Sequence, residues 1–324
     1  MCDVRTASDA RRISYLCHEC QRNYGLGYVL GSVKDYIARR DRLRAILARR
    51  RSSYFSGLMS NKKVECSFRM DKLIQRAVVK AGREVLKRFG KDKVKYMKSD
   101  HLWDCVTDAD IMSERIIISE ISKKHFNHGI LAEESGKKNS DSDYIWIIDP
   151  IDGTMNFSSD VPLFGVMAAL AHHDRVVLSA IYLPVTKELF FAKEGKGAYL
   201  NGKRIHCSQR KDLNRTMGLG QLTLRGQPRK FMDNIMKKVK SKHFALSSFG
   251  AMSINACYVA SGRRDWAVPL EGEVHDFAPA YLLLKESGCK VTDIKGNPWK
   301  LSKQGMVAAN PVLHRQLLKL TKNI

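Results

Sequence analysis

Apolar side chains in the body of the chain recur first with the spacing of helices and then with that of strands. Residues 70–89 place apolar positions three and four apart, which predicts an amphipathic helix, and Gly90 follows where that helix should stop. The segment 106–110 is predicted to open a second helix. The apolar runs 129–132 and 145–148 are short, which predicts strands, and the second is expected to be buried on both faces.

The second half of the chain continues with short elements separated by turns. Residues 164–200 alternate apolar segments with turn residues, which predicts antiparallel strands, and Asn201-Gly202 is typical of a β-hairpin turn. The segment 197–204 nearly matches the phosphate-binding Gly-x-x-x-x-Gly-Lys-Ser/Thr loop, but arginine in the last position favours the hairpin. The remaining predicted elements are a helix at 250–261, a strand at 264–268, a helix at 275–288 with Pro279 in its first turn, strands at 290–293 and 305–309, and a helix capped by Asn310 and Pro311.

Composition indicates a globular protein with a large excess of basic residues. The 324 residues are 44% hydrophobic and 27% charged, enough for one large domain or two ordinary ones. No apolar run approaches the roughly 20 residues of a membrane-spanning helix, and the first residues lack a secretory signal, so we expect a cytoplasmic protein without membrane contact. The formal charge of +23 would attract nucleic acid or phosphorylated small molecules, but no basic motif with interleaved aromatic residues singles out nucleic acid.

The first 66 residues differ from the rest in being rich in arginine. Within them, 32–51 has the pattern of a basic helix. Arginine-rich leaders occur in organellar transit peptides, but the acidic residues of this segment argue against that interpretation. Met59 and Met70 are both available as alternative starts. We therefore predict a basic N-terminal extension of unassigned function at 1–66, followed by one domain at 67–324.

Five acidic residues stand at the ends or starts of predicted elements rather than on polar faces. These residues are Asp110, Glu133, Asp149, Asp152 and Asp276. Because Asp-Pro and Asp-Gly are common turn dipeptides, a solvated loop is the alternative interpretation of the stretch after residue 148. Carboxylate and carbonyl oxygens are the ligands that Mg²⁺ prefers, so the set also indicates a site for that ion.

Four motifs, in order, resemble those of the inositol monophosphatase family. Residues 146–157, Trp-Ile-Ile-Asp-Pro-Ile-Asp-Gly-Thr-Met-Asn-Phe, resemble its first signature, and 276–288 resemble its second. Val-Thr-Asp-Ala-Asp at 106–110 and Ala-Glu-Glu-Ser at 132–135 resemble the family's other acidic motifs. The resemblance covers the chain from about Met70 to its end. It implies an α/β protein with the α/β/α/β/α sandwich of the fructose-1,6-bisphosphatase type, usually a homodimer.

The resemblance also implies a metal-binding role for each acidic residue near the first signature. Glu133, Asp149 and the carbonyl of Ile151 would hold one Mg²⁺. Asp149, Asp152 and Asp276 would hold a second, and the family arrangement has room for two or three ions. The implied activity is that of a Mg²⁺-dependent, lithium-sensitive phosphomonoesterase, in which metal ions neutralise an anionic transition state.

The same resemblance implies which residues meet the water and the substrate. Asp110 and Thr154 would orient and deprotonate the attacking water, Asp110 acting through the threonine hydroxyl or a neighbouring water held by a metal. The N–H groups of Gly153 and Thr154 would receive phosphate oxygens. The full set implied to contact substrate is Ile151, Asp152, Gly153, Thr154, Gly250, Ala251, Met252 and Asp276.

The chain departs from the family pattern around the second signature. His275 stands where the family usually has tryptophan, and we favour a packing role over a new polar contact. The glutamate of inositol-selective members has Pro269 at its ungapped position, and Glu271 matches only with a shift. A common arginine is replaced by Ser247. Lys98 either adds positive charge near the water or is one of many surface lysines.

These observations predict a phosphatase whose substrate is a small phosphorylated polyol, sugar or nucleotide. Inositol 1-phosphate is the default, and fructose 1,6-bisphosphate, 3′-phosphoadenosine 5′-phosphate and histidinol phosphate are the alternatives on the same scaffold. Asp152→Asn is expected to remove charge at the second metal with little effect on the fold. The alternative of another class is a basic protein that keeps this fold and binds RNA or another macromolecule, because the charge and the arginine-rich extension would suit it.

Overall fold

A computed structural model describes residues 55–98, 105–139, 141–222, 226–322 and 324, with side chains from Met70 onward. The chain divides into two units, residues 1–66 and 67–324, and the second contains all the predicted site residues. The basic helix predicted at 32–51 lies outside the described residues, and the function of the extension stays unassigned. In the described part of the chain, no helix is long and apolar enough to cross a membrane.

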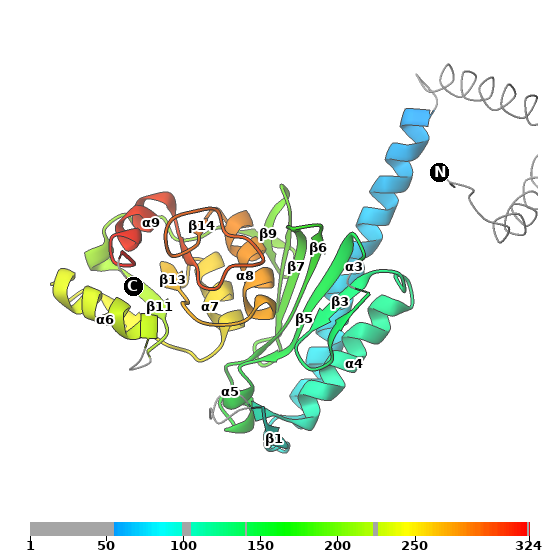
Figure 1. The fold of residues 1–324 in the computed structure, drawn as a ribbon, viewed down its shortest axis with the longest axis horizontal. Coiled ribbons are helices and arrows are strands. Elements are labelled where there is room, and N and C mark those ends of the chain that lie inside the picture. Colours follow the sequence, from blue (N-terminus) through cyan, green and yellow to red (C-terminus); the bar gives the residue numbers. More distant parts are fainter. Residues whose placement is uncertain (1–54, 99–104, 140, 223–225, 323) are drawn as a thin grey trace, which may run out of the picture. The chain divides into compact units, whose positions relative to one another are not determined.

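The larger of two main sheets in the second unit has eight strands, ordered β10-β9-β8-β7-β6-β5-β3-β4 (Figure 1). All neighbouring strands in it are antiparallel except the parallel pair β3 and β5. The strands are β3 (Gly129–Ala132), β4 (Gly136–Lys138), β5 (Tyr144–Asp152), β6 (Gly165–His172), β7 (Arg175–Leu183), β8 (Glu188–Lys193), β9 (Gly197–Leu200) and β10 (Lys203–Ile205). The antiparallel strands predicted across 164–200 are confirmed.

The smaller sheet has five strands in the order β12-β11-β13-β15-β14. Its strands are β11 (Met217–Gly220), β12 (Ala245–Ser247), β13 (Trp266–Val268), β14 (Lys290–Thr292) and β15 (Val307–Ala309), and a separate two-stranded ribbon pairs β1 (Tyr96–Met97) with β2 (Cys105–Val106). The helices are α3 (Phe55–Arg88), α4 (Asp108–Ser122), α5 (Thr154–Ser158), α6 (Gly226–Lys238), α7 (Met252–Ala260), α8 (Val274–Glu286) and α9 (Pro311–Leu318), with a 3₁₀ turn η2 (Leu213–Arg215).

Three apolar clusters hold these elements together as layers. One cluster joins α3 and α4 to the large sheet, the second places α7 and α8 between the two sheets, and the third joins the small sheet to α6 and α9 (Figure 1). The order is therefore helix, sheet, helix, sheet, helix, which is the predicted α/β/α/β/α sandwich. Strand β5 lies in the middle, with Trp146 and Ile148 in the first cluster and Ile147 in the second, so its predicted burial on both faces is confirmed.

Local sequence signals end and connect several elements as predicted. Helix α3 ends at Arg88 and is followed by Gly90 at a φ of 78°. Asn201 and Gly202, with φ values of 48° and 80°, form the turn between β9 and β10, which confirms the hairpin. The Asn310 side chain accepts hydrogen bonds from two N–H groups at the start of α9, as a capping residue should.

The predicted position of Pro279 within its helix was wrong. Helix α8 begins at Val274, so Pro279 is its sixth residue and lies beyond the first turn. Proline has no N–H, and the carbonyl of His275, four residues earlier, therefore lacks its usual helical partner. The Pro279 carbonyl accepts a hydrogen bond of 2.7 Å from Ser179 of β7, which fastens this turn of α8 to the large sheet.

Strands β11 and β12 and helix α6, between the β10 hairpin and residue 249, were not predicted from the sequence. The two strands are short and the helix has low hydrophobicity, so their local sequence signals are weak. The buried side chain of Trp266 contacts this region. Trp266 of β13 is fully buried and covers Gly218, where a Cβ would come within 1.9 Å of the indole. Phe231 of α6 meets the same ring edge-on at 6.3 Å between centroids.

We expect Trp266→Ala to destabilise the protein by about 3–5 kcal/mol, because it leaves a cavity between the small sheet and α6. The matched control is Phe126→Ala, an aromatic truncation at a side chain that is 81% exposed, with an expected change within about 0.5 kcal/mol. Equilibrium urea denaturation of both variants measures the difference. Equal stability of the two variants would contradict the packing described for Trp266.

Candidate active site

Strand β5 carries two of the predicted acidic residues at its carboxyl end. Its pairing with β6 shifts register between Asp149 and Asp152, so the chain departs from regular pairing where the carboxylates occur. Gly153 then has a φ of 89° and precedes α5. The predicted turn after residue 148 is therefore built on the sheet itself, and both aspartates are buried rather than part of a solvated loop.

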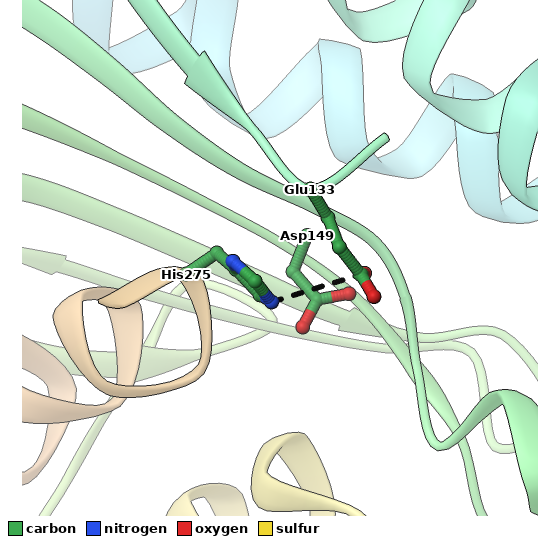
Figure 2. Close-up of side chains that lie close together, drawn as sticks. All are labelled: Glu133, Asp149 and His275. Carbon is green, nitrogen blue, oxygen red and sulfur yellow. Dashed lines mark ion pairs between the residues drawn. The ribbon is translucent and has the colours of Figure 1, made fainter. Parts of the chain in front are cut away.

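The carboxylates form two groups that share Asp149. Ligand atoms of Glu133, Asp149 and His275 lie within 4.8 Å of one another, and so do those of Asp149, Asp152 and Asp276. Figure 2 shows the first group, with Glu133 beyond β3, Asp149 on β5 and His275 at the start of α8. Residues far apart in sequence thus meet at one end of the large sheet, as the resemblance implied.

Asp149 has the most unfavourable environment for a charge in this site. It is 1% exposed, and its Oδ1 atom has no hydrogen-bond partner. Burial raises the pKa of Asp149 well above its ordinary value, and the charges of Glu133, Asp152 and Asp276 raise it further. A buried carboxylate without a partner costs free energy unless a positive charge compensates for it.

The donor atoms in both groups fit a divalent cation. Carboxylate oxygens predominate, as Mg²⁺ prefers, and the oxygens are close enough for each group to share one ion. Asp149 belongs to both groups, and its buried Oδ1 has no hydrogen-bond partner, so this carboxylate would be available to a cation at either group. We conclude that the residues present suit the metal-dependent chemistry that the sequence implied.

Asp110 and Asp276 are placed by the same local device on two different helices. Each is the third residue of its helix, in α4 and α8, and each accepts a hydrogen bond at Oδ2 from the N–H of the preceding capping residue. Those donors are Thr107 at 2.8 Å and Glu273 at 2.6 Å. The cap fixes one oxygen and leaves the other for the site, and the helix N-terminus favours the negative charge.

The free oxygen of Asp110 faces Thr154. Thr154 Oγ1 lies 3.0 Å from Asp110 Oδ1 and 2.8 Å from the carbonyl oxygen of Ile151, so its single proton is shared between two acceptors. Burial raises the pKa of Asp110 to about 7, although the hydrogen bonds from Thr107 lower it. A carboxylate that titrates near neutral pH is suited to exchanging a proton through the threonine hydroxyl.

Asp152 is held by the start of α7. Its Oδ1 accepts from the Met252 N–H at 2.9 Å, and its Oδ2 accepts from both the N–H and the hydroxyl of Ser253. Burial and the charge of Asp276 raise the pKa of Asp152 to about 7, although these hydrogen bonds lower it. An amide –NH₂ in Asp152→Asn would face donor groups on one side, and the small effect of this change on the fold that we expected from the sequence stays a prediction.

The predicted substrate-contact residues Gly250, Ala251 and Met252 lie beside the first signature. A Cβ at Gly153 would come within 2.9 Å of the Ala251 Cβ and 3.0 Å of a backbone oxygen, so a glycine is required there by space as well as by φ. Asn156 donates to the carbonyl of Phe249 at 2.7 Å and fixes the approach of this segment. Backbone N–H groups thus gather near Asp152 without side chains between them.

Glu133 is paired with the lysine whose role the sequence left open. Lys98 Nζ donates to Glu133 Oε1 at 2.8 Å and to Glu134 Oε1 at 2.7 Å. Partial burial lowers the pKa of Lys98, but the two carboxylates raise it more, so the net shift is upward. Glu114 of α4 accepts from the N–H groups of Glu134 and Ser135 at 2.8 and 3.0 Å and holds the loop after β3 in place.

His275 lies close to two of the predicted metal-binding carboxylates. Its Nε2 atom is 4.0 Å from Glu133 Oε2, as the dashed line in Figure 2 marks, and it belongs to the group that contains Asp149. The geometry therefore favours a polar role over the packing role that we expected from the sequence.

Several residues that support the site were not identified from the sequence. Thr107 had a visible signal, because Thr-x-x-Asp at the start of a helix is a capping pattern. Ser253 and Glu114 had none, since one meets a carboxylate 101 positions away and the other binds a loop 20 positions away. Such contacts depend on how the layers assemble.

We expect Asp149→Asn to stabilise the metal-free protein at pH 8 by roughly 0.5–2 kcal/mol, because the folded wild type must either bury this charge among other carboxylates or take up a proton, and an amide needs neither. Asp174→Asn, at an exposed turn, is the control and should change stability little. Urea denaturation in the presence of a chelator measures both. A destabilised Asp149→Asn protein would show that Asp149 is already compensated.

The stability of the metal-free protein should fall as pH rises from 6.5 to 7.5. Asp110, Asp152 and Asp276 have raised pKa values of about 7, so the folded state binds protons that the unfolded state has released, and folding loses this advantage as they ionise. Half-buried His128 and buried His314, with pKa values lowered to about 4, act in the opposite direction only below pH 6.5. The urea midpoint of the metal-free wild type should fall across this window, and its dependence on pH should become weaker when Mg²⁺ is added. A midpoint that rises with pH would contradict the raised pKa values of the three aspartates.

Known proteins share both the sequence and the fold of this chain. The model of the inositol monophosphatase family matches residues 69–324. The inositol-1-monophosphatase of Mesorhizobium japonicum is 35% identical over 251 residues, covering 76% of this chain and 93% of the relative. The fructose-1,6-bisphosphatase/inositol-1-monophosphatase of Thermotoga maritima is 30% identical over 221 residues, covering 68% and 84%.

A solved structure agrees with these sequence relatives. The crystal structure of extragenic suppressor protein suhB from Bartonella henselae matches with a TM-score of 0.71 and 32% identity, over 78% of this chain and 98% of that one. Membership in one family accounts for three features of this chain. These are the order of its acidic motifs, its layered sandwich and the meeting of its carboxylates at one end of the large sheet. The chain belongs to the inositol monophosphatase family and is a phosphatase of that family.

Proposed function

We propose that this phosphatase is a Mg²⁺-dependent phosphomonoesterase that uses two ions and acts on a small phosphorylated polyol, with inositol 1-phosphate as the default substrate. The observation that carries the proposal is that Asp149, whose buried Oδ1 has no hydrogen-bond partner, is shared by two groups of ligand residues. Mg²⁺ bound at these groups would supply positive charge that neutralises the phosphate and lowers the pKa of the attacking water. Lithium sensitivity, a homodimeric assembly and a third ion are further proposals from the resemblance.

The residues around Thr154 can manage the proton of the attacking water. Thr154 Oγ1 can donate to Asp110 Oδ1 at 3.0 Å, which leaves a lone pair of the hydroxyl for a hydrogen bond from water. As the water attacks, its proton passes to the hydroxyl and the hydroxyl's proton passes to Asp110. The raised pKa of Asp110, about 7, makes it a competent acceptor near neutral pH.

Phosphate binding is supported by backbone geometry at the end of β5. Gly153 has no side chain, and Ala251 approaches it closely. The N–H groups of Gly153 and Thr154 lie at the start of α5, where a phosphate oxygen could accept from them without a carboxylate between. Asp152 keeps the segment at Met252 in place through its own hydrogen bonds.

Glu271 is the residue that could select the sugar part of the substrate. Glu271, the shifted match to the glutamate of inositol-selective members, is exposed, and its backbone carbonyl accepts from Gln221 at 2.7 Å. Gln221 Oε1 in turn accepts from the N–H groups of Leu270 and Glu271 at 2.8 Å each. This network fixes the backbone ahead of α8 and leaves the Glu271 carboxylate free to meet a hydroxyl of the substrate. The cytosol is the proposed location, and the buried thiols of Cys207, Cys257 and Cys289, which form no disulfide, suit a reducing compartment.

We expect the purified protein with Mg²⁺ to release phosphate from inositol 1-phosphate, and Thr154→Val to lower kcat by about 10²–10⁴-fold with little change in KM. Valine keeps the shape of threonine but removes the hydroxyl that links water to Asp110. Thr154→Ser, which keeps the hydroxyl, is the matched control and should retain most of the activity. Phosphate release is measured by a colorimetric assay.

The same assay decides among substrates. Fructose 1,6-bisphosphate, 3′-phosphoadenosine 5′-phosphate and histidinol phosphate are tested beside inositol 1-phosphate, and kcat/KM ranks them. A higher kcat/KM for one of the alternatives would replace the default substrate. No phosphate release from any of these esters would overturn the proposed activity.

A second function is proposed for the extension alone. Residues 1–66 contain 14 of the 56 lysines and arginines against six acidic residues, a composition that suits binding to RNA or another polyanion. This function would exist beside the phosphatase activity, because the ligand atoms of the site are intact in residues 67–324.

If the extension binds RNA, the full chain should bind single-stranded RNA with a steep dependence on salt that residues 67–324 alone lack. Replacing Arg49, Arg50 and Arg51 by glutamine should reduce the slope of log K against log[salt] by up to about 2, near 0.7 per phosphate contact, without affecting phosphatase activity. Fluorescence anisotropy across a salt series measures the slope. An unchanged slope after removal of residues 1–66 would assign RNA binding to the phosphatase domain instead.

A further inference from the structure

His275 and Asp276 are consecutive residues at the start of α8, yet they join different groups of carboxylates. His275 lies with Glu133 and Asp149, whereas Asp276 lies with Asp149 and Asp152. The first group, drawn in Figure 2, therefore contains an imidazole nitrogen, and the second contains carboxylates alone. This difference has a chemical consequence for the ions that the two groups select.

We propose that His275 is a nitrogen ligand to a divalent cation held with Glu133 and Asp149, so that this position binds a first-row transition ion such as Mn²⁺ or Zn²⁺ more tightly than Mg²⁺. The inference rests on the proposed function and names the ion preference of one of its two metal positions. The other position, with Asp149, Asp152 and Asp276, keeps the all-oxygen set that Mg²⁺ prefers.

The distance between the ring and the carboxylate is that of two ligands of one ion. With metal–nitrogen and metal–oxygen bonds of about 2.0–2.2 Å, two ligands of one ion lie about 3 Å apart at a right angle and about 4.2 Å apart on opposite sides. His275 Nε2 and Glu133 Oε2 are 4.0 Å apart, within that range and too far for a direct hydrogen bond. The ring is 16% exposed, so surrounding atoms hold it in this orientation.

Each carboxylate of the group has an oxygen that other contacts leave available. Lys98 binds Glu133 through Oε1, and it is Oε2 that faces His275. The buried Oδ1 of Asp149 has no hydrogen-bond partner. One nitrogen and two carboxylate oxygens therefore converge, and none of the three has to give up a hydrogen bond found in the structure.

The identity of the ligands sets the preference. Imidazole is a softer donor than a carboxylate and suits transition ions, whereas Mg²⁺ prefers oxygen donors and water. Tryptophan, the usual family residue at this position, offers only an N–H donor and no ligand atom. The replacement by histidine thus adds a ligand to one metal position while Asp276 next to it keeps its place in the other.

The test compares metal binding by metal-free wild type, His275→Phe and His275→Trp. The matched control is His206→Phe, which removes an exposed histidine outside the site. Pulsed EPR of bound Mn²⁺ detects hyperfine coupling to an imidazole nitrogen, and titration calorimetry gives the Kd for Mn²⁺ and for Mg²⁺. Thermal melts verify that each variant is folded, and the tryptophan variant restores the residue that the family usually carries.

We expect nitrogen coupling in the wild type and in His206→Phe but in neither His275 variant. The Kd for Mn²⁺ should weaken by about 10-fold or more in both His275 variants, while the Kd for Mg²⁺ changes by less than about threefold. Wild type that binds Mn²⁺ and releases phosphate but shows no nitrogen coupling would overturn this inference and leave the proposed function standing. Wild type that binds no divalent cation and has no activity would overturn both.

Discussion

Carboxylates that repel one another within 4.8 Å have to be held together by the rest of the fold. Burial of Asp149 and its neighbours opposes ionisation, as their raised pKa values show, so the metal-free site is a source of instability. The fold tolerates it because each carboxylate is anchored by an element that is stable for other reasons. The site therefore depends on layers of apolar contact that do not themselves take part in the chemistry.

Strand β5 belongs both to the apolar layers and to the group of carboxylates. Its first half alternates large apolar residues between two cores, Trp146 and Ile148 on one face and Ile147 on the other. The strand is thus fixed on both sides before it reaches Asp149. Helices α4 and α8 come from opposite faces of this sheet and present Asp110 and Asp276 through identical capping arrangements. The layers that contain α4 and α8 therefore each place an acidic residue at the end of β5, which is held in position by apolar contacts on both faces.

The sequence predicted those parts of the molecule whose signals are local. The ordered motifs located the five acidic residues, hydrophobic spacing located α4, β5 and the part of α3 from residue 70, and the Asn201-Gly202 dipeptide located the hairpin. The region that contains α6 and β12 was not predicted, because contacts such as those of Trp266 with Gly218 and Phe231 organise it, and these join residues distant in sequence. For the same reason, the support that Ser253 gives Asp152 was visible only in the structure.

The start of α8 shows how a phosphatase of this family can change its ion preference without losing its site. Asp276 is fixed by its bond to the Glu273 N–H, and that bond uses no atom of the His275 side chain. Position 275 can therefore change while the all-carboxylate group stays intact. Pro279 adds to this independence, because it gives no N–H to the His275 carbonyl and so leaves the first turn less tightly tied to the rest of the helix. His275 lies near Glu133 Oε2 and near Asp149, whose Oδ1 has no hydrogen-bond partner. The three side chains would therefore be available to one cation.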